Sequence, residues 1–285
     1  MAPDLNERRA DGSVRGLLAT AMERLAGEDA AAEAAILLAH VLARPRSWLL
    51  AWPEHEPTTD ECARFAALVE ARARGEPVAY LIGRRGFWTF ELEVTPAVLI
   101  PRPETERLVE LALARLPAER QARVADLGTG SGAIALALAS ERPRAQVVAS
   151  DASSAALELA RRNARRLGLE RVAFVEGDWC AALGARMFDL IASNPPYIAA
   201  ADPHLARGDL RFEPAAALAS GADGLDALRS IVAQARFHLG EGGWLLLEHG
   251  HDQGAAVRSL LAAGYREIGT ERDHAGHERV TFARR

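Results

Sequence analysis

Apolar residues in the first quarter of the chain recur at every third or fourth position, which is the spacing of one face of an α-helix. Residues 14–26, 30–42 and 59–74 follow this pattern, and each segment predicts a helix. Thr59 or Asp60 stands where a cap of the last helix is expected. The pattern therefore predicts a small helical domain over residues 1–75.

Residues 80–100 have a different character, because aromatic and β-branched residues are frequent there and glycines interrupt them. This segment predicts a β-hairpin. The proline-rich sequence over 100–104 then forms a rigid loop, and a helix is expected from there to about Leu116. We assign residues 76–105 to a hairpin and linker.

Further along the chain, short apolar runs alternate with amphipathic helical segments. Strands are expected over 123–127, 146–150, 172–176, 188–193, 243–248, 265–270 and 279–283. Helices are expected over 132–140, 154–167, 225–239 and 253–263. This alternation predicts an α/β domain over 106–285 with a mostly parallel, doubly wound sheet. The last two strands have no helix between them, so we expect them to pair antiparallel.

Composition narrows the class of protein. Of the 285 residues, 49% are hydrophobic and 26% are charged, a mixture typical of globular proteins. The apolar stretches fall short of the roughly 20 residues of a membrane span, and the polar residues 1–12 do not resemble a secretory signal. Cys62 and Cys180 form no metal or redox motif, which fits a cytoplasmic protein. The net charge of −5 disfavours stable binding to nucleic acid, although it leaves room for a local basic patch.

A glycine-rich turn follows the first strand of the α/β domain and opens a helix. Such a turn lets a ligand approach the backbone closely, so we expect cofactor contacts from Gly128, Thr129, Gly130, Ser131 and Gly132. Asp151 ends the next strand, roughly 20 residues further on, where a carboxylate can accept both hydroxyls of a ribose. The alternatives are a glycine turn without a ligand and, for Asp151, an N-cap of the following helix.

Two further candidates follow the third strand at the same edge of the sheet. Asp178 can bond the amino group of an adenine, and Trp179 can stack on or flank the base. The alternative for Trp179 is ordinary packing in the core. The glycine loop contains no Lys or Arg, so a cofactor without phosphates, such as S-adenosylmethionine, fits it better than a dinucleotide.

The sequence Asn-Pro-Pro-Tyr over 194–197 directly follows an apolar strand and is the most specific local signal in the chain. An amide or aromatic amine nitrogen is a poor nucleophile, because its lone pair is delocalised. The side-chain oxygen of Asn194 and the carbonyl of Pro195 can accept its two N–H groups, while the prolines keep the loop rigid. Tyr197 offers a flat face to a planar group. We predict methyl transfer to such a nitrogen, with Asn194, Pro195 and Tyr197 as catalytic residues and Pro196 as a further substrate contact; the alternative is a double-proline turn that ends a strand.

A group of histidines near the C-terminal end of the sequence raises the question of a metal. Glu248 adjoins the first of them, and the group consists of His249, His251, His274 and His277. Their spacing lacks a recognised ligand frame, so we expect no metal site. Glu248 ends a predicted strand, and we expect a structural role for it.

At these residues the chain resembles the release-factor glutamine methyltransferases, the HemK/PrmC family. The similarity covers nearly the whole chain and includes the segments 80–83, 87–88, 99–105, 126–134, 177–179, 193–198, 202–203, 211–214, 221–226 and 243–250. Adenine methylases share the Asn-Pro-Pro-Tyr sequence. Its combination with the loop at 99–105 and an N-terminal helical domain is much more specific to the glutamine methyltransferases.

The resemblance implies a fold, a reaction and a partner. The fold is the class I S-adenosylmethionine-dependent methyltransferase fold, Rossmann-like, with seven strands and an antiparallel last strand, joined by a β-hairpin to a small N-terminal helical domain. The family methylates the side-chain amide nitrogen N5 of the glutamine in the GGQ motif of class I peptide-chain release factors, and S-adenosylhomocysteine is the other product.

The resemblance also implies roles for single residues. The glycine loop, Asp151, Trp179 and Asn194 contact S-adenosylmethionine, and residues 194–197 hold the glutamine. Phe87 is expected to line the site, and so is Arg102. The helical domain and the hairpin would help to grip the protein substrate.

Several other functions stay open at this point. An adenine-N6 methyltransferase of DNA or RNA uses the same chemistry, but it predicts a basic groove, which the acidic balance disfavours. A related subgroup methylates a glutamine of a ribosomal protein. A binding or scaffold protein could keep the fold without catalysis, but the intact glycine loop and Asn194 argue against it. The spacing of the glycines makes a dehydrogenase the weakest alternative.

Overall fold

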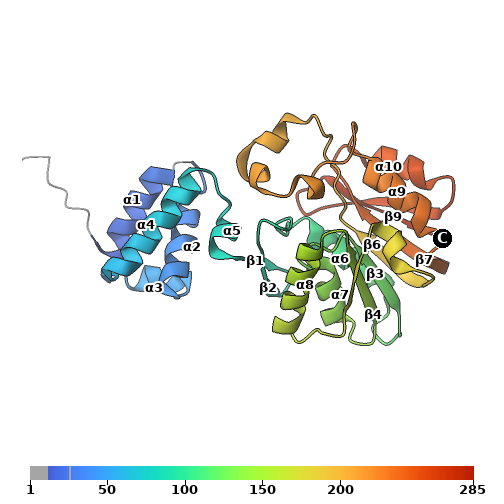
Figure 1. Cartoon of the computed structure of the whole chain (residues 1–285), viewed down its shortest axis with the longest axis horizontal. Coiled ribbons are helices and arrows are strands. Elements are labelled where there is room, and N and C mark those ends of the chain that lie inside the picture. Colours follow the sequence, from blue (N-terminus) through green and yellow to red (C-terminus); the bar gives the residue numbers. More distant parts are fainter. Residues whose placement is uncertain (1–11, 26) are drawn as a thin grey trace, which may run out of the picture. The chain divides into compact units, whose positions relative to one another are not determined.

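A computed structural model of the chain describes residues 12–25 and 27–285. The predictions made for residues 1–11 and for Ala26, including the polar N-terminus and the end of the first helix, lie outside the described residues. The chain folds into two compact units, one ending at Gly83 and the other beginning at Arg84 (Figure 1). The domain boundaries predicted from the sequence lie after residue 75 and after residue 105 instead.

The first unit consists of helices around one apolar core. Their bounds are α1 Val14–Leu25, α2 Ala30–Leu42, α3 Arg46–Ala51, α4 Thr59–Ala73 and α5 Val78–Ile82. The core is built by side chains from each of the first four helices, among them Val14, Leu37, Leu38, Leu49, Phe65 and Val69. The short helices α3 and α5 were not predicted. Each follows a proline, and a proline is tolerated at a helix start because the first N–H groups have no partner within the helix.

The cap of α4 differs from the prediction. Thr58, not Thr59 or Asp60, precedes the helix with an extended backbone, whereas Thr59 is already its first helical residue. The Thr58 hydroxyl accepts from the backbone N–H of Glu61 at 3.3 Å, and the Glu61 carboxylate accepts from the N–H of Thr58 at 2.8 Å. This reciprocal pair is a capping box.

The second unit opens with a hairpin of two short strands, β1 Arg84–Phe87 and β2 Phe90–Glu93, which pair antiparallel. The hairpin was predicted, but its start at residue 80 was wrong. Residues 80–82 belong to α5, which ends at Gly83 in a left-handed conformation. The first residues of the segment predicted as a hairpin therefore form the end of α5.

A seven-stranded sheet forms the centre of the second unit, in the order β5-β4-β3-β6-β7-β9-β8. The strands are β3 Arg123–Leu127, β4 Gln146–Asp151, β5 Ala173–Glu176, β6 Phe188–Ser193, β7 Leu239–Glu248, β8 Arg266–Arg272 and β9 Glu278–Arg284. The strands from β5 to β7 are parallel, whereas β9 pairs antiparallel with both β7 and β8. The predicted antiparallel pairing of the last two strands is confirmed. The strand order reverses beside β3, and in such sheets ligands bind at the carboxyl ends of the strands there.

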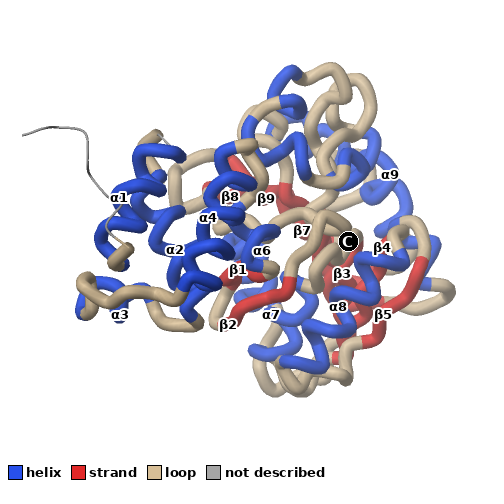
Figure 2. Tube along the Cα trace, turned by 60° about the vertical axis from the view of Figure 1, so that its left-hand side comes forward, coloured by secondary structure: helices blue, strands red, loops and turns tan. Residues whose placement is uncertain are grey.

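Helices cover both faces of this sheet, whose strands β3, β4 and β5 run side by side in Figure 2. The helices are α6 Thr105–Arg115, α7 Ala133–Glu141, α8 Ser154–Arg166, α9 Asp226–Ala235 and α10 Gly254–Leu261. Between β5 and α9 the chain also forms the 3₁₀ turns η1 Trp179–Leu183, η2 Pro203–Ala206, η3 Gly208–Phe212 and η4 Ala215–Ala217. Within residues 12–25 and 27–285, no helix has the length and apolarity that crossing a membrane requires.

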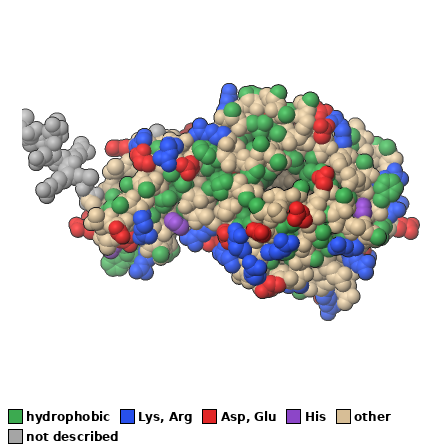
Figure 3. Space-filling model, in the orientation of Figure 1, with side chains coloured by type: hydrophobic (Ala, Val, Ile, Leu, Met, Phe, Trp, Pro, Cys, Tyr) green, Lys and Arg blue, Asp and Glu red, His purple; other side chains and the backbone are tan. Residues whose placement is uncertain are grey.

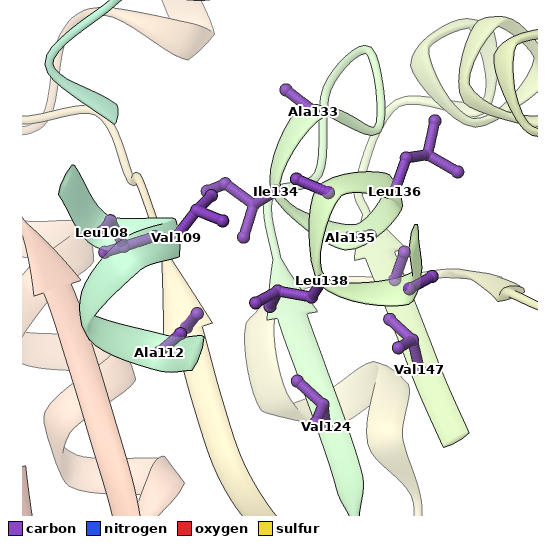
Figure 4. Packing of buried hydrophobic residues seen from close by; sticks show 14 of the residues in the cluster. Leu108, Val109, Ala112, Val124, Ala133, Ile134, Ala135, Leu136, Leu138 and Val147 are labelled. Atoms are coloured by element: carbon purple, nitrogen blue, oxygen red, sulfur yellow. The ribbon is translucent and has the colours of Figure 1, made fainter. Parts of the chain in front are cut away.

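Alternating residues of each central strand enter two different cores. In β6, Leu190 joins the core formed with α6 and α7, and Ile191 joins the core formed with α9 and α10. Figure 4 shows the first core, with Val109 of α6 beside Ile134 of α7. Because the side chains of a strand point to opposite faces in turn, a strand covered on both faces is mostly apolar, as β6 is.

Candidate active site

A cavity of about 490 Å³ lies in the second unit at the carboxyl ends of β3, β4, β5 and β6. This volume is within the range of small-molecule sites. Of the residues predicted to bind a cofactor, the cavity is lined by Gly128, Thr129, Gly130, Ser131, Asp151, Asp178, Trp179 and Asn194. Gly132 does not line it, and is buried where a Cβ would lie 3.0 Å from a side-chain carbon of Leu136.

The glycine loop turns sharply at Gly128, whose φ is +71°. Its N–H donates to the carbonyl of Ser150 at 2.9 Å, which holds the turn beside β4. A Cβ at Gly128 would lie 3.2 Å from the ring of Trp179. Trp179 itself has a φ of +42°, an uncommon conformation for a residue with a side chain. The indole of Trp179 therefore packs against the turn at Gly128, and it also forms part of the cavity wall.

Asp151 is held by two backbone groups. Its Oδ2 accepts from the N–H of Gly130 at 2.8 Å, and its Oδ1 accepts from the N–H of Ser153 at 2.9 Å. The N-cap of α8 is Ser153, whose hydroxyl accepts from the N–H of Ala156 at 3.2 Å, so the helix-cap alternative for Asp151 is wrong. Each carboxylate oxygen retains a further lone pair, and Asp151 lines the cavity.

Asp126, in the central strand β3, holds the glycine loop by hydrogen bonds. This carboxyl group is fully buried, and its Oδ2 accepts from the hydroxyl of Thr129 at 2.6 Å and from the N–H of Ala135 at 3.1 Å. Burial raises the pKa of Asp126 to about 7. No role was predicted for Asp126, and the structure makes it the group that fixes Thr129.

The Asn-Pro-Pro-Tyr loop leaves β6 at the rim of the cavity. The Asn194 side-chain nitrogen donates to the hydroxyl of Thr105 at 3.1 Å. Within the described chain, no residue is recorded as donating to Oδ1 of Asn194 or to the carbonyl of the buried Pro195. Two acceptors therefore lie at the end of β6 without a donor among the described residues.

A second, smaller cavity of about 60 Å³ adjoins the first. It is lined by Asn194, Pro195, Pro196 and Tyr197, and by Leu99, Arg102, Ile198, Leu210, Ala217 and Leu218. Both cavities are lined by Leu99, Arg102, Asn194, Pro196 and Ala217. The residues predicted to bind the cofactor, except Gly132, thus lie around the large cavity, and those predicted to bind the substrate lie around the small one.

Contacts on three sides fix the course of the loop. Before it, the Ser193 hydroxyl donates to the carbonyl of Leu127 at 2.7 Å. After it, the carbonyl of Tyr197 accepts from the side-chain nitrogen of Gln253 at 2.9 Å, and the N–H of Ile198 donates to the carbonyl of Leu218 at 2.9 Å. The Tyr197 ring packs against the core beneath, where burial raises the pKa of its hydroxyl.

Glu213 joins two walls of the site. Its side chain is fully buried, accepts from the N–H of Ile100 at 3.0 Å and forms an ion pair with Arg102. The loop before α6 is thereby tied to the segment that contributes Pro214, Ala216 and Ala217 to the cavity wall. No role was predicted for Glu213, although it lies in the segment 211–214, which is one of those similar to the family.

The family resemblance implied that Arg102 and Phe87 line the site. Arg102 lines both cavities. Phe87 does not line them: it is 2% exposed and packs in the core with Leu92 and Leu108. Phe87 is the one buried residue of β1, and its side chain packs into this core rather than lining either cavity.

Asn163 is a supporting residue for which no sequence motif predicted a role. It is 1% exposed on α8, and its side-chain nitrogen donates to the carbonyls of Glu93 and Ser131 at 3.0 and 2.9 Å. Its oxygen accepts from the N–H of Glu93 at 2.7 Å. One amide therefore links the end of the hairpin to the glycine loop.

The histidines near the C-terminal end occupy separate places. His249 is buried and contacts the hydroxyl of Thr281 and the carbonyl of Gly250, both at 2.8 Å. His274 lies 3.4 Å from Glu110, whereas His277 meets the ring of His251. In the part of the chain that the structure describes, no three His, Cys, Asp or Glu side chains form a group suited to a metal ion.

Comparison with known proteins identifies the family. The model of the PrmC N-terminal domain matches residues 16–83, and that of the methyltransferase small domain matches residues 106–219. The release factor glutamine methyltransferase of Xylella fastidiosa (strain Temecula1) is 58% identical over 269 residues, which cover 94% of this chain and 96% of that protein. The chain belongs to the release factor glutamine methyltransferase family. The family member of Escherichia coli (strain K12) is 49% identical over 260 residues, covering 91% of this chain and 94% of that protein.

Solved structures show the same fold at lower identity. The 16S rRNA N2 G1207 methyltransferase of T. thermophilus has a TM-score of 0.54 and 23% identity, covering 71% of this chain and 49% of that chain. A methyltransferase from Pyrococcus furiosus has a TM-score of 0.53 and 17% identity, covering 77% and 96%. The predicted fold class and family are thus confirmed, and the chain is a methyltransferase of this family.

Proposed function

We propose that this enzyme transfers a methyl group from S-adenosylmethionine to the side-chain nitrogen N5 of the glutamine in the GGQ motif of class I peptide-chain release factors. One observation carries the proposal. Among the described residues nothing donates to Oδ1 of Asn194 or to the carbonyl of Pro195, and these two acceptors lie at the small cavity lined by Tyr197, which adjoins a cavity of cofactor size. The names of the relatives support release factors as the protein substrate.

The residues around the large cavity fit S-adenosylmethionine. Gly128 lacks the Cβ that would crowd the Trp179 ring, Asp151 has lone pairs for ribose hydroxyls, and Asp178 is an exposed acceptor for an adenine amino group. The glycine loop holds no basic side chain, which suits a ligand without phosphates. When bound, S-adenosylmethionine supplies a methyl group that its sulfonium makes electrophilic.

The chain's own contribution is positioning. Asn194 and Pro195 accept the two N–H groups of the glutamine amide, which fixes its plane and concentrates electron density on the nitrogen. Tyr197 and Pro196 provide the walls of the small cavity against which a planar amide lies. A group held at its attack distance reacts as if its local concentration were very high, so orientation supplies much of the rate.

Charge supports a protein substrate rather than a nucleic acid. The net charge is −5, and acidic and basic side chains lie interspersed on the face drawn in Figure 3. Tight binding to a polyphosphate backbone needs a basic footprint. An adenine methyltransferase is the second candidate, since it shares the Asn-Pro-Pro-Tyr sequence, and a ribosomal-protein glutamine methyltransferase is the third.

The N-terminal unit is assigned to docking the release factor. Leu50 and Trp52 are 84% and 59% exposed, and large apolar side chains of this kind are common at the centres of protein interfaces. Methylation of release factors would take place where translation occurs, so the proposal includes a cytoplasmic location. No stable complex with nucleic acid and no attachment to a membrane are part of this proposal.

Methyl transfer from radiolabelled S-adenosylmethionine tests the function. Purified release factors are compared with the same proteins carrying Gln-to-Ala in the GGQ motif, with DNA and RNA oligonucleotides and ribosomal proteins in parallel. Label that appears on release factors and vanishes with the glutamine supports the proposal. Label on nucleic acid alone, or on a ribosomal protein alone, overturns it in favour of the second or third candidate.

A further inference from the structure

Gln253 precedes α10 and contacts the Asn-Pro-Pro-Tyr loop from the side of β7. Its side-chain oxygen accepts from the backbone N–H of Gly250 at 2.9 Å, and its side-chain nitrogen donates to the carbonyl of Tyr197 at 2.9 Å. The first partner can only donate and the second can only accept, so the Gln253 amide has a single orientation. Gln253 lines neither cavity, and the mechanism above does not use it.

Two glycines give the Gln253 amide its place. Gly224 has a φ of +78°, and a Cβ there would overlap the carbonyl oxygen of Tyr197 and lie 2.9 Å from the side-chain nitrogen of Gln253. A Cβ on Gly250 would lie 3.0 Å from the side-chain oxygen of Gln253. Backbone segments without side chains therefore approach the amide from two directions.

His249 holds the turn at Gly250. Its Nδ1 lies 2.8 Å from the carbonyl of Gly250, and its Nε2 lies 2.8 Å from the hydroxyl of Thr281. A carbonyl only accepts, so Nδ1 carries a proton. The ring is buried, and burial lowers the pKa of His249, which keeps the ring neutral. Nε2 therefore accepts the proton of Thr281.

The order of donors continues through two threonines to an arginine. The Thr281 hydroxyl gives its one proton to His249, so it accepts from the hydroxyl of Thr270, 2.8 Å away. Thr270 in turn accepts at 2.7 Å from the guanidinium of Arg258, which only donates. Every proton is thereby placed along the chain of hydrogen bonds from Arg258 on α10 to the carbonyl of Gly250.

We propose that Gln253 is a positioning residue for methyl transfer, which holds the carbonyl of Tyr197 and thereby fixes the Tyr197 ring in the wall of the small cavity. His249 and the chain of hydrogen bonds behind it fix the turn at Gly250 to which Gln253 is anchored. The inference rests on the proposed function for its catalytic meaning, because Tyr197 is there proposed to meet the glutamine amide. Gln253 acts on the substrate only through the loop.

Fluorine NMR tests the inference without catalysis. The chain has three tyrosines, so 3-fluorotyrosine labelling gives three signals, and Tyr197→Phe identifies that of Tyr197. In Gln253→Glu an oxygen replaces the nitrogen that donates to Tyr197, and in Gln253→Met both polar atoms are removed. Both variants should shift or broaden the Tyr197 signal. Gln234→Met is the matched control, since Gln234 donates to Ser230 within α9, and it should leave the Tyr197 signal in place. A Tyr197 signal unchanged in both Gln253 variants overturns the inference.

The chain of hydrogen bonds behind Gly250 has its own test. Thr281→Val removes the donor to His249 with little change of volume, and it should move the Tyr197 signal in the same direction as Gln253→Met. Thr281→Ser keeps the hydroxyl and should leave the signal at its wild-type position. The ¹⁵N signals of the His249 ring should show a proton on Nδ1 alone. A proton on Nε2, or a Tyr197 signal that ignores Thr281→Val, overturns the role given to His249.

Kinetics with the release factor separates positioning from binding. Gln253→Met should lower the turnover number by about tenfold, as for one lost hydrogen bond, while KM and the affinity for S-adenosylmethionine stay within about twofold of wild type. Gln234→Met should turn over like the wild type. A wild-type turnover number in Gln253→Met overturns the inference. If the wild type itself methylates no release factor, the proposed function fails, whereas the fluorine signals still decide whether Gln253 positions Tyr197.

Discussion

The backbone N–H of Gly130 donates a hydrogen bond to Oδ2 of Asp151 over 2.8 Å, which ties the loop after β3 to the end of β4. One carboxylate thus both shapes the glycine loop and faces the cavity. Because both parallel strands end at this edge of the sheet, the ligand site and its support are built from the same few residues.

Asp151→Ala should weaken binding of S-adenosylmethionine by about tenfold to a hundredfold, since it removes a charged acceptor and loosens the Gly130 turn. Isothermal titration with S-adenosylmethionine and with S-adenosylhomocysteine measures the change. The helix α8 should keep its stability, because Ser153 is its cap. An unchanged dissociation constant would remove Asp151 from the cofactor site.

Asn194→Ala should lower methyl transfer by about a hundredfold or more, because the target nitrogen loses one of the two groups that orient it. Binding of S-adenosylmethionine should remain within a few-fold of wild type, since the glycine loop and Asp151 are untouched. Single-turnover kinetics with saturating release factor separates the two effects. An active Asn194→Ala enzyme contradicts the role given to this side chain.

Gly128→Ala and Gly130→Ala form a matched pair. Both glycines have a positive φ, +71° and +56°, so each substitution should cost about 1 kcal/mol of stability. They differ in their surroundings, since a Cβ at Gly128 meets the Trp179 ring at 3.2 Å and a Cβ at Gly130 meets nothing within 4 Å. Affinity for S-adenosylmethionine should therefore fall further in Gly128→Ala. Equal losses, measured by titration, would show that Trp179 does not border the cofactor.

The docking role of the N-terminal unit is tested with Leu50→Ser and Trp52→Ser together. Both side chains are exposed, so the double variant should fold normally. Its KM for the intact release factor should rise about tenfold, as for the loss of interface anchors worth 1 to 2 kcal/mol. Affinity for S-adenosylmethionine serves as the control and should not change. A KM equal to that of wild type assigns docking to other residues.

Stability should fall as the pH rises towards neutrality. Burial raises the pKa values of Asp126 and Glu248 to about 7, from ordinary values of 3.8 and 4.5. Between those values and pH 7 the folded protein binds more protons than the unfolded chain, so this contribution is full below about pH 4 and is lost as the pH passes through 7. Urea unfolding at several pH values from 5 to 8 measures the slope. Glu248→Gln should make it shallower, and an unaltered slope would contradict the assignment of Glu248.

Local spacing was sufficient to predict the central strands. The bounds of β3 and β6 agree with the predicted segments 123–127 and 188–193. Both strands are buried on two faces, so they stand out as short, mostly apolar runs between polar turns. The site motifs were predictable for a related reason: the glycine turn and the Asn-Pro-Pro-Tyr loop each directly follow such a strand, and strand ends at one edge of a parallel sheet come together.

The supports of the site were not predictable in this way. Thr105 bonds Asn194 across 89 positions of sequence, and Glu213 bonds Ile100 across 113. Periodicity is a property of windows of about 11 to 18 residues, so it carries no information on such pairs. The short helices after Pro45 and Pro77 were overlooked for a local reason, because a proline both interrupts and begins helices.

The position of β9 has a consequence for the order of assembly during synthesis. The ribosome makes β8 before β9, yet β9 lies between β7 and β8 in the sheet. A nascent chain that has emerged only as far as Arg272 therefore has nowhere to place β8, and the free edge of β7 stays open to wrong pairing. β8 can join the sheet only through β9, and the end of β7 that carries Glu248 gains its Val280 neighbour only when β9 pairs with it.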